Sequence, residues 1–321
     1  MTTAGLFGAP GYRLLGGWCG VGARAGSCTI SDRRTKMTTV PQAPAVQGVP
    51  AFLELEITGQ CQLTCPKLCY ATAGPKKGHG SMATADWKTL ISEAAEIGVR
   101  KVQFIGGEPT LHPDFEELVH HALHVGLDVQ VYTNLYAVSN MHWRWFTHPR
   151  VSLGTSYYSD VAEEHDRVTG RPGSHTATRA NIVLALAKNI RVQVGVVGVF
   201  DGQRITQAHD ELVALGVPRV NLDHVRSVGR AEVHEPSRAD LCGRCADARA
   251  AVMGDGTVVP CVLGRFLPAG NARDDGLAGV FGGAMWKEIA ASIPRAATGC
   301  PPADSNDCSP ANTPACDPAY D

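Results

Sequence analysis

The segment Cys61-Gln-Leu-Thr-Cys65-Pro-Lys-Leu-Cys69 follows closely on the apolar, β-rich run from Phe52 to Thr58. If that run is a strand of a parallel sheet, the thiols lie in the loop at its carboxyl end, where ligand sites gather in α/β folds. Pro66 disfavours a continuous helix there, and a loop can wrap three thiolates around one centre. Thiolates select zinc or iron-sulfur centres, and no suitably spaced fourth Cys or His completes a closed zinc site. The segment therefore predicts an iron-sulfur centre with one open iron.

From Phe52 onward the chain alternates short β-rich runs with longer helical patterns, which indicates repeated βα units and a parallel sheet. Gly98, Gly126 and Gly216 fall where helices should end. The pattern predicts an α/β fold, a partial (β/α)6 TIM-like barrel with a small Cys-rich C-terminal module. The expected strands are Phe52 to Thr58, Lys101 to Ile105, Asp128 to Thr133, Val151 to Ser156, Arg191 to Val199 and Val220 to His224, and the main helices are Ala85 to Ile97, Pro113 to Val125, His175 to Lys188 and Arg204 to Leu215.

A second motif, Gly106-Gly107-Glu108-Pro109, follows the second expected strand. Two glycines let the backbone approach a ligand closely, and Glu108 can accept a hydrogen bond from a cation. A strand, a three-cysteine loop and this turn one βα unit later together resemble the radical SAM superfamily. The resemblance implies that Cys61, Cys65 and Cys69 hold a [4Fe-4S] cluster whose open iron binds S-adenosylmethionine (SAM). It also implies reductive cleavage of SAM to a 5′-deoxyadenosyl radical, which abstracts hydrogen from the substrate.

The chain departs from this family in the cysteine loop. The usual spacing is C-x3-C-x2-C, whereas this chain has C-x3-C-x3-C, so the loop is one residue larger. Leu68 stands where the family places an aromatic residue, and Tyr70 follows the last cysteine, which leaves the adenine contact open. Buried or zinc-binding thiols are the alternative interpretation.

Further SAM contacts are implied by the resemblance. The segment from Gly106 to Pro109 would grip the amino group of SAM, and the strand ends carrying Thr133, Asn134 and Ser156 would face its ribose or carboxylate. A hydroxyl group at a strand end is, however, more often part of a cap or a turn.

One arginine is expected to bind the SAM carboxylate, because a planar guanidinium suits that geometry. The run His165-Asp-Arg-Val-Thr169-Gly-Arg171-Pro-Gly-Ser174 resembles one found in peptide-modifying members, with Thr169 in place of the usual Arg. We assign Arg171 to the SAM carboxylate. Arg179 is the alternative, and either arginine could instead be a solvated loop residue.

The C-terminal part contains a second set of cysteines. Cys242-Gly-Arg-Cys245 precedes a hairpin signal, Gly254-Asp-Gly256, and then Cys261. This arrangement resembles the SPASM or twitch extension of radical SAM enzymes, which implies one auxiliary [4Fe-4S] cluster on Cys242, Cys245, Cys261 and Cys300. Zinc remains an alternative, because C-x2-C is also half of a zinc ribbon. The roles of Cys308 and Cys316 stay open.

Composition limits the partners. With 44% hydrophobic and 19% charged residues and a net charge of -2, the chain is typical of soluble globular proteins, and no basic patch indicates nucleic acid. Its apolar runs are too short to cross a membrane, and its N-terminus lacks the apolar core of a secretory signal. We therefore expect a cytoplasmic protein, in which the 11 cysteines indicate metal ligation or catalysis and not disulfides.

The chain divides into three parts by composition. Residues 1–50 are rich in Gly, Ala, Pro and Thr, which predicts a disordered N-terminal segment, and Met37 is a candidate for the true start. Residues 51–228 are expected to form the barrel, and residues 229–321 the iron-sulfur module. The stretch from Cys300 to Asp321 cannot bury a core unaided, so metal or cluster ligation is expected to order it.

The resemblance favours a peptide or protein as the substrate, because members with such a C-terminal module mostly modify ribosomally made peptides. A small molecule or cofactor precursor is the alternative substrate, and an iron-sulfur or zinc scaffold without catalysis is the alternative function. The resemblance also implies an external electron donor such as a flavodoxin or a ferredoxin.

Overall fold

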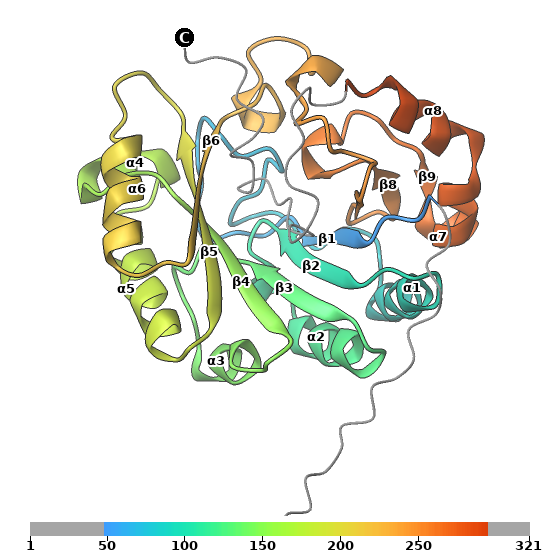
Figure 1. The fold of residues 1–321 in the computed structure, drawn as a ribbon, viewed down its shortest axis with the longest axis horizontal. Coiled ribbons are helices and arrows are strands. Elements are labelled where there is room, and N and C mark those ends of the chain that lie inside the picture. The colour runs from blue at the N-terminus through green and yellow to red at the C-terminus, as the bar shows by residue number, and fades with distance from the viewer. Residues whose placement is uncertain (1–47, 295–321) are drawn as a thin grey trace, which may run out of the picture. The chain divides into compact units, whose positions relative to one another are not determined.

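The computed structural model describes residues 48–294, and these form one curved nine-stranded sheet covered by helices (Figure 1). The strand order is β6-β5-β4-β3-β2-β1-β7-β8-β9. The strands are β1 (Phe52–Thr58), β2 (Lys101–Gly106), β3 (Asp128–Tyr132), β4 (Val151–Tyr157), β5 (Arg191–Gly198), β6 (Arg219–His224), β7 (Arg249–Val252), β8 (Thr257–Val259) and β9 (Gly270–Asn271).

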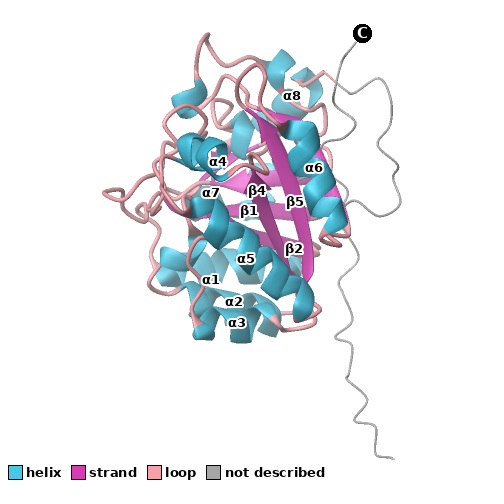
Figure 2. Cartoon of the chain, turned by 90° about the vertical axis from the view of Figure 1, so that its left-hand side faces the viewer, coloured by secondary structure: helices cyan, strands magenta, loops and turns pink. Residues whose placement is uncertain are grey.

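The first six strands are all parallel, and a connection with at least one helix joins each of them to the next. Figure 2 shows α1, α2 and α3 lying side by side along the sheet. The sheet does not close, which confirms the predicted partial barrel. The helices are α1 (Thr84–Glu96), α2 (Phe115–His124), α3 (Asn140–Phe146), α4 (Ala162–Thr169), α5 (Ser174–Ala187), α6 (Ile205–Ala214), α7 (Ala272–Gly282) and α8 (Ala284–Ser292).

Strand β1 is buried along its whole length, because helices cover one face and the barrel interior covers the other. Leu53, Leu55 and Ile57 belong to the main hydrophobic core, together with Trp87 of α1. Since side chains alternate across a strand, Glu54 and Glu56 point to the opposite, inner face. The polar positions of β1 are therefore buried and not exposed to solvent.

The C-terminal strands extend this sheet on the other edge of β1. β7 pairs with β1 in parallel, from Phe52 opposite Arg249 to Leu55 opposite Val252. The expected hairpin forms, because β7 and β8 are antiparallel with Ala251 opposite Val259. The hairpin that precedes Cys261 is thus joined directly to the strand that precedes the three-cysteine loop.

The strands begin at the expected residues, except that β6 begins one residue earlier, and helix ends differ by one or two residues. Gly98, Gly126 and Gly216 have the positive φ angles of helix C-terminal glycines. The sequence patterns do not predict α4, which forms part of the run ending at Ser174. No helix in residues 48–294 is long and apolar enough to cross a bilayer. Met37, Cys300, Cys308 and Cys316 lie outside the described residues.

Candidate active site

An open pocket lies at the carboxyl ends of the parallel strands. Its empty volume is about 1060 Å³, which includes open solvent at the mouth. The wall combines apolar and polar side chains from the loops after β1, β2, β3, β4 and β6. Of the predicted site residues it includes Cys61, Cys65, Cys69, Gly106, Gly107, Thr133, Asn134 and Ser156.

The three-cysteine loop (Cys61–Cys69) turns its free thiols to this pocket. The Cys61 sulfur accepts hydrogen bonds from the Leu63 N–H at 3.4 Å and from Asn134 Nδ2 at 3.6 Å. The Cys69 sulfur accepts one from the Ala73 N–H at 3.4 Å. N–H donors around sulfur stabilise thiolates that ligate iron-sulfur clusters.

Burial raises the pKa of the Cys61 thiol to about 12, with smaller contributions from Glu108 and Cys69. The pKa of Cys65 is raised by burial and by the neighbouring Cys69 and Cys61. Thiolates crowded in this way need the positive charge of a metal centre beside them. Three soft donors at one open pocket therefore fit a [4Fe-4S] cluster with one iron left free.

The loop is held by main-chain hydrogen bonds from several elements. The Cys65 N–H and the Thr64 N–H both donate to Thr169 O, at 2.8 and 3.2 Å, and the Cys61 N–H donates to Gly74 O at 3.2 Å. Cys65 has a φ of 35°, in the left-handed region that non-glycine residues rarely adopt. The C-terminal end of α4 thus fixes the middle of the loop.

The Gly106-Gly107 pair lets β2 approach the loop very closely. A Cβ at Gly106 would lie 2.2 Å from Thr58 O, and one at Gly107 would lie 2.3 Å from Gln60 O. The Gly107 N–H donates to Thr58 O at 2.7 Å. Only glycine fits at these two positions, so main-chain atoms line the pocket there.

Glu108 and Pro109 are buried beside this turn and do not line the pocket. The Glu108 carboxylate accepts hydrogen bonds from Thr110 Oγ1 at 2.7 Å and from the Asn134 N–H at 2.8 Å. Burial raises its pKa. In this structure Glu108 ties the end of β3 to the turn after β2.

Thr133 and Asn134 follow β3, and Ser156 lies in β4, where all three face the pocket. The Asn134 Oδ1 accepts from Gln62 Nε2 at 3.2 Å, which joins Asn134 to the three-cysteine loop. Ser156 Oγ lies 2.9 Å from Tyr132 Oη. The structure therefore brings these predicted polar groups to one wall beside the thiols.

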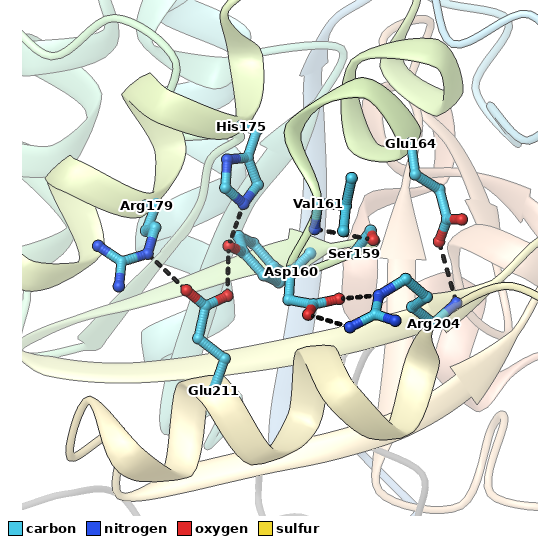
Figure 3. A network of polar contacts seen from close by, with 9 residues as sticks. Ser159, Asp160, Val161, Glu164, His175, Arg179, Arg204 and Glu211 are labelled. Atoms are coloured by element: carbon cyan, nitrogen blue, oxygen red, sulfur yellow. Dashed lines mark hydrogen bonds and ion pairs between the residues drawn. The ribbon is translucent and has the colours of Figure 1, made fainter.

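The two candidate arginines for the SAM carboxylate, Arg171 and Arg179, do not line the pocket. Arg171 lies over the ring of Tyr136, 5.1 Å from its centre, and Arg179 pairs with Glu211 at 2.6 Å. Figure 3 shows Arg179, Glu211 and His175 in a network that also holds the Arg204–Asp160 pair. The assignment of Arg171 to SAM stays a prediction.

Several pocket residues were not predicted as site residues. His165 of α4 is 1% exposed, and burial with the neighbouring His175 lowers its pKa to about 3, so the imidazole is neutral. Arg226, paired with Asp223 at 2.9 Å, and Arg230 also line the pocket. Asp223 could have been found, because it lies at the carboxyl end of an expected strand.

The C-terminal thiol trio (Cys242, Cys245 and Cys261) is compact, with Cys245 and Cys261 buried and Cys242 partly exposed. The sulfurs of Cys245 and Cys261 are 2.7 Å apart, and those of Cys242 and Cys245 are 4.0 Å apart. Cys245 and Cys261 are only 1% and 3% exposed. Within residues 48–294 no group of three or more His, Cys, Asp and Glu residues is placed to hold a single metal ion. The structure brings three predicted ligands together, and Cys300 lies outside the described residues.

Buried ionic groups lie between the trio and the three-cysteine loop. Glu54 accepts from the Val262 N–H at 3.0 Å and pairs with Arg249 at 3.5 Å. Glu56 pairs with Arg265, whose guanidinium lies over the ring of Tyr70. Burial raises the pKa of Glu54 to about 6 and that of Glu56 to about 7, against the opposing effect of the paired arginines.

Comparison with known proteins gives a family and several relatives. Residues 55–212 match the family model of the radical SAM superfamily. The chain is 36% identical over 129 residues to a PqqA peptide cyclase of Rhodopseudomonas palustris, and this alignment covers 40% of this chain and 34% of the relative. It is 47% identical over 88 residues to the PqqA peptide cyclase of Bradyrhizobium diazoefficiens, which covers 27% of this chain and 22% of the relative. The chain therefore spans 34% and 22% of the length of these two relatives.

Solved structures share the fold at low sequence identity. Streptococcus suis SuiB bound to the precursor peptide SuiA matches with a TM-score of 0.63 and 14% identity, over 76% of this chain and 67% of that chain. The protein anSMEcpe with bound AdoMet and the Cp18Cys peptide matches with a TM-score of 0.56 and 13% identity, over 74% of this chain and 81% of that chain.

Proposed function

We propose that this chain, whose residues 55–212 match the family model of the radical SAM superfamily, cleaves SAM in order to modify a peptide or protein. The observation that carries the proposal is the shared pocket, where three free thiols, two glycines and the polar ends of β3 and β4 meet. A cluster or zinc carrier has no need of such a pocket.

In this proposal Cys61, Cys65 and Cys69 hold the SAM-binding [4Fe-4S] cluster. When bound, the cluster supplies the electron that cleaves SAM and so generates the 5′-deoxyadenosyl radical. Gly106 and Gly107 leave room for the ligand beside main-chain groups, and the polar wall of β3 and β4 orients it.

The apolar part of the wall keeps water away from the reacting atoms. It includes Leu63, Tyr158, Val197 and Leu263. Exclusion of water protects a reactive radical from side reactions. A peptide substrate is supported by the names of the curated relatives, which are peptide cyclases, although each alignment covers only part of those proteins.

We also assign the C-terminal thiol trio to one auxiliary [4Fe-4S] cluster, with Cys300 as the fourth ligand. The support for it is the closeness of three soft donors, of which Cys245 and Cys261 are buried. The proposed domains are residues 51–228 for the barrel and 229–321 for the module, after the N-terminal segment 1–50. A flavodoxin or a ferredoxin is the proposed electron donor.

The central test is SAM cleavage by the full chain after anaerobic reconstitution with iron and sulfide. With dithionite and SAM, the wild type is expected to release 5′-deoxyadenosine. Cys65→Ala removes one ligand and should lower that rate at least about 100-fold, since loss of even an outer partner of a metal site costs 10- to 100-fold. Lys67→Ala, at an exposed position of the same loop, is the matched control and should keep the wild-type rate.

A well-formed cluster without 5′-deoxyadenosine would contradict the enzymatic proposal. The substrate class is tested with short peptides encoded next to the gene of this chain, by the mass change of the peptide and by deuterium transfer into 5′-deoxyadenosine. Turnover with a small molecule and none with any such peptide would overturn the peptide proposal while leaving SAM cleavage intact.

A further inference from the structure

The segment that follows β6 returns to the three-cysteine loop. It forms a short 3-10 turn over Gly229–Ala231, and the Arg230 N–H donates to Cys69 O at 3.0 Å. Gly229 has a φ of 66°, and a Cβ there would lie 2.3 Å from Tyr70 O. This segment therefore packs on the last turn of the loop by main-chain contact.

The side chain of Arg230 reaches the middle of the same loop and the segment just after it. Its Nε donates to Cys65 O at 3.1 Å, its Nη1 donates to Ala73 O at 2.7 Å, and its Nη2 donates to Thr64 O. Three nitrogens of one rigid, planar group thus bind three carbonyls, which the irregular loop leaves without helix or sheet partners.

These bonds act where the loop is strained and enlarged. Cys65, with its φ of 35°, is held on its N–H side by Thr169 O and on its carbonyl side by Arg230. A non-glycine residue keeps such a conformation only when its surroundings impose it. The additional residue between Cys65 and Cys69 gives the loop more freedom, and Arg230 bridges both sides of that insertion.

We propose that Arg230 is a positioning residue that fixes the enlarged three-cysteine loop in the form able to bind its cluster. The proposal rests on the proposed function, because it assumes that these thiols ligate iron and sulfide. We expect that lysine cannot replace arginine in this role, since one ammonium group cannot reach three carbonyl oxygens that lie in different directions.

The test compares Arg230→Lys and Arg230→Met in the full chain with Arg150→Lys as the matched control. Arg150 also binds a carbonyl and a carboxylate, Gly126 O and Asp128, but it precedes β4 at the opposite end of the sheet. Both Arg230 variants should bind iron about 10- to 100-fold more weakly in chelator competition. In the reduced protein, the part of the electron paramagnetic resonance spectrum that responds to SAM should change its g-values or disappear.

Normal iron affinity and an unchanged spectrum in Arg230→Lys would overturn the proposal. The thermal stability of the cluster-free proteins is measured as well. If both Arg230 variants lose clearly more stability than Arg150→Lys, the proposal is also overturned, because Arg230 would then support the whole fold. Amide hydrogen exchange on the cluster-free chain gives a readout without iron. Amides of residues 61–74 should exchange faster in Arg230→Lys than in the wild type, and equal rates would contradict the proposal.

The exchange measurement separates the two proposals. If the wild type binds no iron at the loop, the proposed function fails, yet faster loop exchange in Arg230→Lys would still show that Arg230 orders the loop. If the wild type cleaves SAM and Arg230→Lys does so equally well with equal exchange, only the role of Arg230 fails.

Discussion

The two cysteine regions of this molecule are held in opposite ways. The three-cysteine loop opens on a pocket, and its backbone is fixed by main-chain hydrogen bonds, by close contacts with glycines and by the Arg230 side chain. In the C-terminal thiol trio Cys245 and Cys261 are buried, and the residue after Cys261 is bound by a carboxylate that itself pairs with a buried arginine. The difference teaches that the three-cysteine loop depends on contacts to its backbone, whereas the C-terminal thiol trio depends on a buried ion pair beside it.

The largest effect is expected from removing the charge that supports the trio. Arg249→Met leaves Glu54 as a buried carboxylate without its ion-pair partner, and should lower the free energy of unfolding by about 3–5 kcal/mol at pH 8. Near pH 5 the loss should shrink, because the raised pKa lets Glu54 take up a proton. Urea unfolding at both pH values measures this.

Lys88→Met is the control for Arg249→Met. It breaks the surface pair of Lys88 with Glu117, whose side chains are 39% and 53% exposed, and should cost less than about 1 kcal/mol. A loss in Arg249→Met that is equal at pH 5 and pH 8 would show that charge is not what supports the trio.

The next effect concerns Glu56, between the two regions. Its pKa is raised by burial from 4.5 to about 7, so the folded chain holds this proton more tightly than the unfolded chain. The resulting stability is fully present below about pH 4.5 and lost as the pH rises to about 7, a fall of about 3 kcal/mol. Glu56→Gln should flatten this fall in urea unfolding measured across the same range, whereas Glu117→Gln should not. If the stability of Glu56→Gln falls with pH as steeply as that of the wild type, Glu56 is not the group that causes the fall.

The smallest effect on stability is expected beside the three-cysteine loop. Gly107→Ala forces a Cβ against Gln60 O and should cost about 2 kcal/mol, at every pH between 5 and 8. Gly74→Ala is the control, since its Cβ would meet nothing within 4 Å, and should change stability by less than about 0.5 kcal/mol. Equal costs in the two variants would show that close approach at Gly107 is unimportant.

The strands and their order along the chain could be predicted from the sequence, because each parallel strand is a short apolar run ended by a turn. The thiols and glycines of the pocket could be predicted as well, since ligand sites follow the carboxyl ends of such strands. Glu54 and Glu56 could not, because their alternation with apolar residues looks the same whether the polar face meets solvent or a barrel interior.

Other parts of the site depend on contacts between distant segments. Arg230 meets Thr64 and Cys65 more than 160 residues earlier in the chain, and no local pattern signals that. His165 is conspicuous in the sequence, but its burial depends on α4, which the patterns do not predict. The arginine for the SAM carboxylate stays a prediction, because Arg171 and Arg179 each already have a neighbouring partner.

The parallel pairing of β7 with β1 has a consequence for engineering this protein. A chain truncated so that it ends before Arg249 would leave one edge of β1 unpaired, although β1 is apolar on its outer face and lies in the interior of the sheet. Bare edges of that kind recruit strands from other molecules and promote aggregation. A minimal catalytic fragment should therefore keep the C-terminal hairpin, even when its cysteines are dispensable for the reaction under study.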